Sequence, residues 1–270
     1  MAGVNKARLI WTWTQEAVWL ALLVLQLPFV FVQKWSSHGR RKEPVLLLTD
    51  LGLSVFAYFR IRMALARAGF PVIVLSIGSV SSLASQARQL ARTLEQLNIQ
   101  KGILVAHGRG GLTALALPDS GRRRIQHLVT LGTPFHGSRF FTPFAFVPAF
   151  GDMNVGSDFL LLHRMNALLF PGFSPFSAYK DEFIYPGNLG HFGQGRDLIL
   201  DRNGHMNLIL DGENIETIVQ HIESLHPEPA GNPEVRAAKP PEVAPPAAKK
   251  SGKKPAKKKP SRPGSKKGKR

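Results

Sequence analysis

Short apolar runs alternate with amphipathic stretches through the middle of the chain, between residues 44 and 226. Six runs have the length and continuous apolar character of strands buried in a parallel sheet. They are Pro44–Thr49, Val72–Ser76, Gly102–Ala106, Leu128–Leu131, Pro175–Tyr179 and Asp197–Asp201. Three longer stretches have apolar residues at helical spacing, and they are Leu51–Ala68, Ser82–Leu97 and Glu213–Leu225. The alternation predicts an α/β fold with a mostly parallel sheet flanked by helices.

Residues 1–43 contain a long apolar segment. From Leu9 to Val32 the only charged residue is Glu16, and all four tryptophans lie in or beside this stretch, as aromatic residues do at membrane interfaces. We therefore predict an N-terminal membrane helix that contacts membrane lipids through residues 9–32. No Ala-x-Ala cleavage site follows it, so an uncleaved single-pass anchor is favoured over a cleaved signal peptide. A helix lying in the membrane interface is a further alternative.

Basic residues on either side of this segment set its expected orientation. Two lie before it and four lie between it and residue 43; they are Lys6, Arg8, Lys34, Arg40, Arg41 and Lys42. The excess after the segment favours an inner-membrane anchor with the folded domain on the cytoplasmic side.

Residues 227–270 have a different composition from the rest of the chain. Ala237 to Arg270 holds thirteen Lys and Arg residues against one acid, Glu242, which is +12 of the net charge of +17. The stretch has no aromatic residue and cannot bury a core, so we expect a disordered basic tail. An anionic polymer such as nucleic acid, or an anionic membrane surface, is the expected partner, bound without base recognition. A tail that only increases solubility is the alternative.

Composition also excludes several kinds of site. Cysteine is absent, so the chain has no disulfides and no thiolate metal ligands. The nine histidines show no metal-binding spacing such as H-E-x-x-H, and no phosphate-binding GxxxxGK[ST] loop is present. We expect neither a metal nor a cofactor.

The most informative motif is Ala106–Gly110, with the sequence AHGRG. It follows the apolar run Gly102–Val105 and precedes a helical stretch, which is the strand, sharp turn and helix context of a G-x-S-x-G nucleophile elbow. The middle residue of an elbow is a serine whose hydroxyl attacks the substrate. Here that residue is Gly108, which has no side chain and cannot attack anything.

From about Pro44 to Leu225 the chain resembles the α/β-hydrolase superfamily, and within it the bacterial lipase and esterase branch. Besides the elbow, several segments carry the resemblance in the family's order. They are Val45–Gly52, Val129–Ser138 (VTLGTPFHGS), Val155–Asn166, Ser177–Asp181 and Asn203–Met206. The resemblance implies an α/β-hydrolase fold, with residues 44–226 as the hydrolase-like domain.

The resemblance also implies where the catalytic residues belong. Asp181 and His205 match the catalytic acid and the catalytic histidine, and we expect them to persist as a remnant acid/base pair. Gly108 then marks the position of the missing nucleophile. The alternative is that Asp181 and His205 are only a turn carboxylate and a capping histidine.

The oxyanion loop departs from the family as well. Asp50, Leu51 and Arg109 are its expected equivalents, and Asp50 stands where the family usually has glycine. A carboxylate at this place opposes a developing negative charge, unless Arg109 neutralises it. Asp50 is also a conceivable carboxylate nucleophile.

Between residues 138 and 176 phenylalanine recurs, and the resemblance identifies this stretch as the cap over the site. Its rings form a slot for an acyl chain, a surface that touches lipid, or simply the core of the cap. The expected ligand-binding residues lie at and just before its start; they are Phe135, His136, Phe140 and Phe141.

These observations predict a membrane-anchored α/β-hydrolase-fold protein without serine hydrolase chemistry, acting as a binding or scaffold module. Its cleft would hold a hydrophobic or acyl ligand. One alternative is an active lipase or esterase that uses an unconventional nucleophile. Another is a structural protein that tethers the nucleoid or the envelope, with the fold as a spacer.

Overall fold

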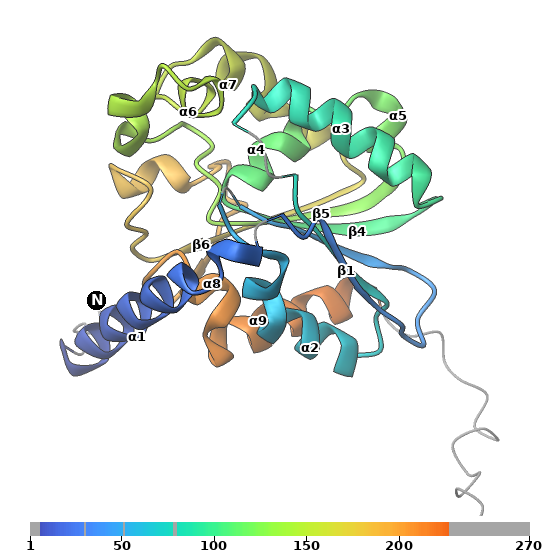
Figure 1. Ribbon diagram of the computed structural model, residues 1–270, viewed down its shortest axis with the longest axis horizontal. Coiled ribbons are helices and arrows are strands. Elements are labelled where there is room, and N and C mark those ends of the chain that lie inside the picture. The colour runs from blue at the N-terminus through green and yellow to red at the C-terminus, as the bar shows by residue number, and fades with distance from the viewer. Residues whose placement is uncertain (1–5, 30, 51, 78–79, 227–270) are drawn as a thin grey trace, which may run out of the picture. The chain divides into compact units, whose positions relative to one another are not determined.

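The computed structural model describes residues 6–29, 31–50, 52–77 and 80–226 (Figure 1). A seven-stranded sheet forms its centre, in the order β1-β3-β2-β4-β5-β6-β7. The strands are β1 (Lys34–Ser37), β2 (Val45–Leu48), β3 (Val72–Leu75), β4 (Gly102–His107), β5 (Ile125–Leu131), β6 (Gly172–Ala178) and β7 (Leu198–Leu200). Only β1 runs antiparallel to its neighbour. The predicted mostly parallel sheet is confirmed.

Helices cover both faces of the sheet (Figure 1). On one face lie α2 (Phe59–Arg67), α8 (Asn207–Leu210) and α9 (Gly212–Leu225), and on the other lie α3 (Leu83–Gln96), α4 (Arg109–Leu115) and α5 (Asp119–Arg122). Successive residues of a strand point to opposite faces, so β2 contributes Val45 and Leu47 to one core and Leu46 and Leu48 to the other. Burial on both faces explains why the strands are continuously apolar.

Two elements differ from the sequence prediction. The helix expected from Leu51 begins later, as a 3-10 turn over Val55–Tyr58 that Ser54 caps and that continues into α2. The edge strand β1 was not predicted, because its sequence, Lys-Trp-Ser-Ser, has no apolar run. Its side chains are alternately exposed and half-buried, as expected at a sheet edge.

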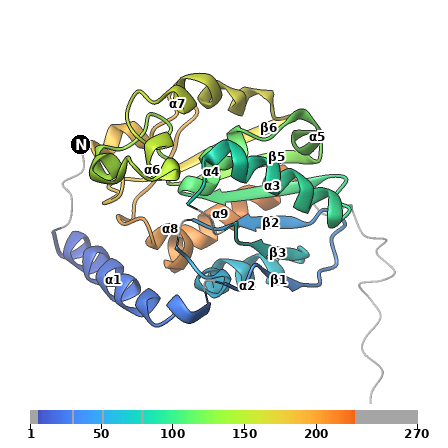
Figure 2. The same ribbon diagram turned by 45° about the horizontal axis from the view of Figure 1, so that its top comes forward.

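The N-terminal helix corrects the expected membrane span. Helix α1 covers Lys6–Val24 and is followed by a 3-10 turn over Leu27–Phe29. Within the described residues, no helix is long and apolar enough to cross a bilayer. On the inner side of α1, Thr12 and Glu16 are instead buried against the loop before α8, so part of this segment packs on protein. Figure 2 shows α1 lying along one end of the domain.

The Phe-rich cap lies between β5 and β6. It consists of a 3-10 turn (Arg139–Phe144), α6 (Pro148–Asp152), α7 (Asp158–His163) and a second turn (Arg164–Leu169); a further 3-10 turn, Gly187–Gly190, follows β6. Phe141 and Phe150 stack with their ring centroids 5.4 Å apart, so part of the cap is its own aromatic core. Residues 227–270, where we expect a basic tail, lie outside the described part of the chain.

Candidate active site

The turn between β4 and α4 places Gly108 at the carboxyl edge of the sheet. Its backbone has φ 50° and ψ −121°, a left-handed conformation that glycine adopts without a steric penalty. A side chain at this position would have no room. Its Cβ would collide with the Asp50 carboxylate and lie 2.9 Å from Nε2 of His205. The space beside the turn is therefore occupied by a carboxylate from the loop after β2.

Asp50 reaches this space from the loop that follows β2. Its Oδ1 accepts the backbone N–H of Arg109 at 3.0 Å, and its Oδ2 lies 3.0 Å from Nε2 of His205. Burial opposes ionisation of Asp50, but the hydrogen bond and charge of His205, together with the charge of Arg109, outweigh it and lower the pKa to about 2. The carboxylate is ionised, and 19% of its side chain remains exposed.

His205 lies between two carboxylates. Its Nδ1 is 2.6 Å from Oδ2 of Asp181, which follows β6, and its Nε2 faces Asp50. Burial alone would lower the pKa of His205, but the charges and hydrogen bonds of Asp181 and Asp50 hold it well above its usual range. Both ring nitrogens therefore donate, and His205 is an imidazolium. The two residues expected as a remnant pair do lie together.

A buried hydrogen-bonded chain supports the site from behind. The backbone N–H of Asp50 donates to the Tyr58 hydroxyl at 2.8 Å, and that hydroxyl is 2.9 Å from Nδ1 of His107. Nε2 of His107 is 3.2 Å from the carbonyl oxygen of His205. Burial lowers the pKa of His107 to about 3, so this ring is neutral.

Three of these groups are close enough to raise the question of a metal. Ligand atoms of Asp50, His107 and His205 lie within 4.8 Å of one another. Both nitrogens of His107 are already in hydrogen bonds, and those of His205 point at carboxylates. Neither ring offers a free lone pair, so the set fits a hydrogen-bond network better than a metal site.

Helix α1 contributes a residue that the sequence prediction did not place at the site. The Glu16 carboxyl group accepts the backbone N–H groups of Met206 and Asn207 at 2.6 and 2.9 Å, directly after His205. Burial, with the hydrogen bond and negative charge of Glu182, raises the pKa of Glu16 to about 9. Glu182 in turn accepts the backbone N–H of His205. The one available signal was a single acid in an apolar segment.

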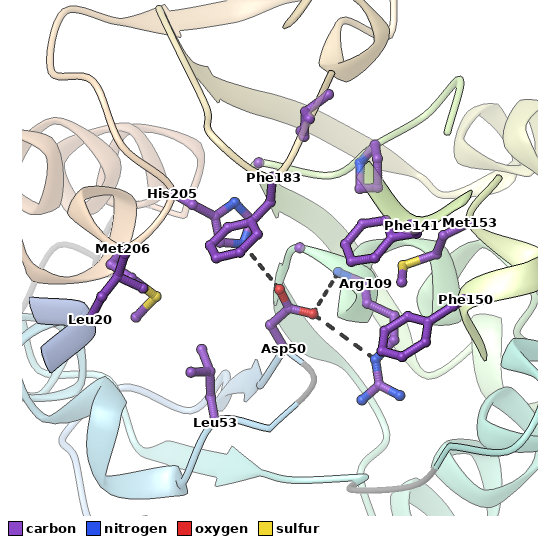
Figure 3. Close-up of a pocket in the computed structure, with 14 residues that line it drawn as sticks. Leu20, Asp50, Leu53, Arg109, Phe141, Phe150, Met153, Phe183, His205 and Met206 are labelled. Carbon is purple, nitrogen blue, oxygen red and sulfur yellow. Dashed lines mark hydrogen bonds and ion pairs between the residues drawn. The ribbon is translucent and has the colours of Figure 1, made fainter. Parts of the chain in front are cut away.

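A cavity of about 210 Å³ opens above Asp50 (Figure 3). Its floor is polar, with Asp50, Arg109 and His205 beside the bare backbone of Gly108. Its walls are apolar and come from five parts of the chain; they include Leu20, Leu53, Phe141, Phe150, Met153, Phe183, Ile184 and Met206. In Figure 3, Leu20 and Met206 lie on one side of Asp50, and Phe141 and Phe150 lie on the other.

Of the four residues expected to bind a ligand, only Phe141 lines the cavity. Phe140, which is exposed, packs edge-on against Phe141. Phe135 is buried in the core beneath the cap. The His136 ring faces Arg164 at 2.9 Å and is not part of the cavity wall. Leu51, expected in the oxyanion loop, lies outside the described residues.

The Arg109 side chain lines the cavity but is only 3% exposed, and buried partners hold it. Its guanidinium donates to the Gln86 side chain at 2.7 Å and to the carbonyl oxygen of Ile77 at 3.3 Å. Its Nε is 4.0 Å from Oδ1 of Asp50. Arg109 thus acts on Asp50 through a buried charge and a backbone hydrogen bond, and the cavity itself presents a carboxylate to a ligand.

No protein-family model matches the chain, and no curated protein matches it in sequence. Solved structures do match. The chain is similar to a lipase from Bacillus licheniformis in its propeptide form, with a TM-score of 0.53 and 14% identity, over 69% of this chain and 53% of that one. It spans 97% of the mature form of the same lipase.

Two further structures align over most of their length. An enol-lactonase from Burkholderia xenovorans aligns with a TM-score of 0.52 and 15% identity, over 72% of this chain and 96% of that one. A meta-cleavage product hydrolase from Pseudomonas fluorescens aligns with a TM-score of 0.52 and 14% identity, over 71% of this chain and 94% of that one. The chain therefore has the α/β-hydrolase fold, as its sequence predicts. At these identities the likeness shows the fold alone.

Proposed function

We propose that this chain is an α/β-hydrolase-fold protein without serine hydrolase chemistry, and that it binds a small apolar ligand in the cavity above Asp50. One observation carries the proposal. The Asp50 carboxylate fills the space that a side chain at position 108 would need, and it accepts the backbone N–H of Arg109. In an elbow of this kind, the N–H after the nucleophile stabilises the oxyanion.

Two requirements of ester hydrolysis, a nucleophile and an oxyanion donor, are then unmet. Loss of the nucleophile costs about a million-fold in rate in a serine protease. Loss of one oxyanion donor costs about 100- to 1,000-fold, and an ionised carboxylate in its place repels the developing charge as well. His205, already protonated between Asp50 and Asp181, cannot act as the general base that a serine needs.

The cavity indicates the chemistry of the ligand. An apolar cavity of about 150 Å³ holds benzene, so about 210 Å³ admits a slightly larger molecule. The walls favour an apolar body, while the exposed part of the Asp50 carboxylate favours a hydrogen-bond donor and repels an anion. The ligand is thus a small apolar alcohol or amine rather than a fatty acid.

Isothermal titration of the full chain with hexanol, hexylamine and hexanoate tests this proposal. We expect hexanol or hexylamine to bind, hexanoate not to bind, and no turnover of acyl esters by the same sample. The variant Leu53→Trp narrows the cavity and should abolish binding. Leu168→Trp, at an exposed position of the cap, is the matched control and should bind normally. Tighter binding of hexanoate than of hexylamine would contradict the proposal.

A second candidate follows from the contact between Asp50 and His205. An ionised carboxylate that faces an apolar cavity can attack an sp³ carbon, such as that of an epoxide. The new bond joins Oδ2 to carbon, the ring C–O bond breaks, and the alkoxide takes a proton from the His205 imidazolium. Neutral His205 then removes a proton from the water that attacks the carbonyl carbon of the Asp50 ester. The ester C–O bond breaks, the diol leaves with the proton of the new Asp50 carboxyl group, and the carboxylate and the imidazolium are restored.

Trapping distinguishes this candidate from simple binding. In His205→Gln the alkoxide takes its proton from water instead, so alkylation should be slower but should still occur, whereas hydrolysis should not. Incubation with 1,2-epoxyhexane should then leave an adduct on Asp50 that mass spectrometry of its peptide detects. Asp50→Asn is the control and should give no adduct. If His205→Gln also stays unmodified while hexanol binds, the site binds ligand without covalent chemistry.

A further inference from the structure

Helix α1 turns two polar side chains, Thr12 and Glu16, inward beside Leu20, and it leaves large apolar side chains exposed on its opposite side. Thr12, Glu16 and Leu20 follow one another at a spacing of four residues and form the inner stripe, of which Thr12 and Glu16 are buried. Trp11, Val18 and Leu22 lie on the opposite side and are exposed. A surface helix of a globular domain normally has the reverse arrangement.

Contacts on the inner side fix this orientation. Glu16 accepts two backbone N–H groups of the His205 loop, and the Thr12 backbone and hydroxyl oxygens accept from the side chains of Asn207 and Asn203. Rotation of α1 to bury its exposed apolar side chains would leave these polar groups without partners, which is unfavourable for groups that stay buried. The apolar side therefore stays outside.

The apolar surface continues past the end of the helix. Its exposed members, from the helix and the turn after it, are Ile10, Trp11, Val18, Leu22, Val24, Leu25, Phe29 and Phe31. We call this set the outer face of α1. On monomeric soluble proteins, large exposed apolar surfaces usually mark an interaction site. Leu20, on the inner side of the same helix, lines the ligand cavity.

We propose that the outer face of α1 docks into the headgroup region of an anionic lipid bilayer, with the helix lying in the plane of the membrane. The net charge of the chain favours an anionic bilayer as the partner of this face. The chain has a net charge of +17, which attracts anionic lipids and opposes the pairing of two copies through the same face. An exposed Trp beside aliphatic residues is typical of helices that lie in this interface. The proposal does not depend on which ligand the cavity takes.

Intrinsic fluorescence offers a direct test, because all four tryptophans lie between residues 11 and 35. With vesicles of phosphatidylglycerol and phosphatidylcholine in equal parts, we expect a blue shift and a stronger emission of the full-length protein. Pure phosphatidylcholine should give a weaker response. Because only this segment carries tryptophan, adhesion through the Lys-rich tail alone leaves the emission unchanged.

Charge substitutions on the outer face should remove the response. Val18→Glu and Leu25→Glu each place a charge on the apolar surface and should weaken partitioning at least about tenfold, since burial of one such side chain contributes about 1.5–3 kcal/mol. Ile199→Glu is the matched control, because Ile199 on β7 is 50% exposed, as is Val18. It should partition like the wild type, and thermal melts should show that all three variants are folded.

Two results would overturn the proposal. One is an unchanged tryptophan emission of the wild type at saturating anionic vesicles, even if the protein sediments with them. The other is a dimer in size-exclusion chromatography that Val18→Glu and Leu25→Glu dissociate while vesicles leave the emission unchanged. That second result would assign the outer face to another copy of the chain.

Discussion

Asp50 controls the protonation of its neighbours at the scale of single residues. Its carboxylate lies 3.0 Å from Nε2 of His205 and holds that ring in the charged form together with Asp181. A serine in the same space would instead leave Nε2 free to accept a proton. The identity of one side chain thus determines whether His205 can act as a base.

Removal of this charge should therefore be visible on His205. In Asp50→Asn the pKa of His205 should fall, because an opposite charge within hydrogen-bond distance is lost while Asp181 remains. NMR titration of the His205 ring measures this directly. Asp201→Asn, at an exposed position, should leave the titration unchanged. A His205 pKa that is insensitive to Asp50→Asn would show that the two groups do not interact.

The residue scale also separates what could be predicted about the site from what could not. Asp181 and His205 were predicted because they follow strand-like runs in the order of a known fold. The altered oxyanion loop was predicted too, from Asp50 in a position usually held by glycine. That the Asp50 carboxylate enters the space beside Gly108 depends on the relative placement of β2 and β4, and no pattern within either segment specifies it.

At the scale of elements, α1 is joined to the His205 loop through a buried acid. Glu16 has a pKa of about 9 in the folded chain against 4.5 when exposed. Between these values the folded chain holds a proton that the unfolded chain releases. Stability therefore falls as pH rises through this window, by at most about 1.4 kcal/mol per pH unit.

Glu16→Gln removes the titrating group and should flatten this dependence. Urea unfolding at pH 6 and pH 8 should show the wild type losing stability over this interval and the variant losing clearly less. Glu216→Gln, an exposed acid on α9, is the control and should keep the wild-type slope. Equal slopes in wild type and Glu16→Gln would mean that Glu16 is ionised in the folded chain.

The same helix shows why the membrane span was predicted and was wrong. Hydropathy along Leu9 to Val32 counts apolar residues without regard to the side on which they lie. In the structure many of these apolar residues belong to the outer face of α1, while Thr12 and Glu16 point at the domain. A single acid in an apolar segment gave the one hint that part of the helix packs on protein.

The central strands were predicted well, because burial on both faces makes them continuously apolar.

At the scale of the whole molecule, one sheet divides two hydrophobic cores. Leu46 belongs to the core under α3 and α4, and Leu47 belongs to the core under α2 and α9, and both are buried. Because the cores share their strands, they should unfold together. Leu46→Ala and Leu47→Ala should each lower the free energy of unfolding by about 2–5 kcal/mol and preserve a single transition.

Calorimetry or urea unfolding checks this expectation. The far-UV signal should follow one midpoint in the wild type and in both variants. Leu161→Ala, at an exposed position of the cap, is the control and should change stability little. Two separated transitions in either core variant would show that the faces fold independently.

The most direct measurement of the central claim compares ester turnover by two variants. In Gly108→Ser the new side chain meets the Asp50 carboxylate, and the Arg109 N–H remains occupied. Adding Asp50→Gly frees both the space and the donor, and it leaves the contact of the His205 ring with Asp181 in place. The double variant should hydrolyse p-nitrophenyl butyrate at least about 100-fold faster than the single variant, and a fluorophosphonate should label it at position 108. The wild type should show neither reaction. Equal activity of the two variants, or wild-type turnover that disappears in His205→Ala, would contradict the account.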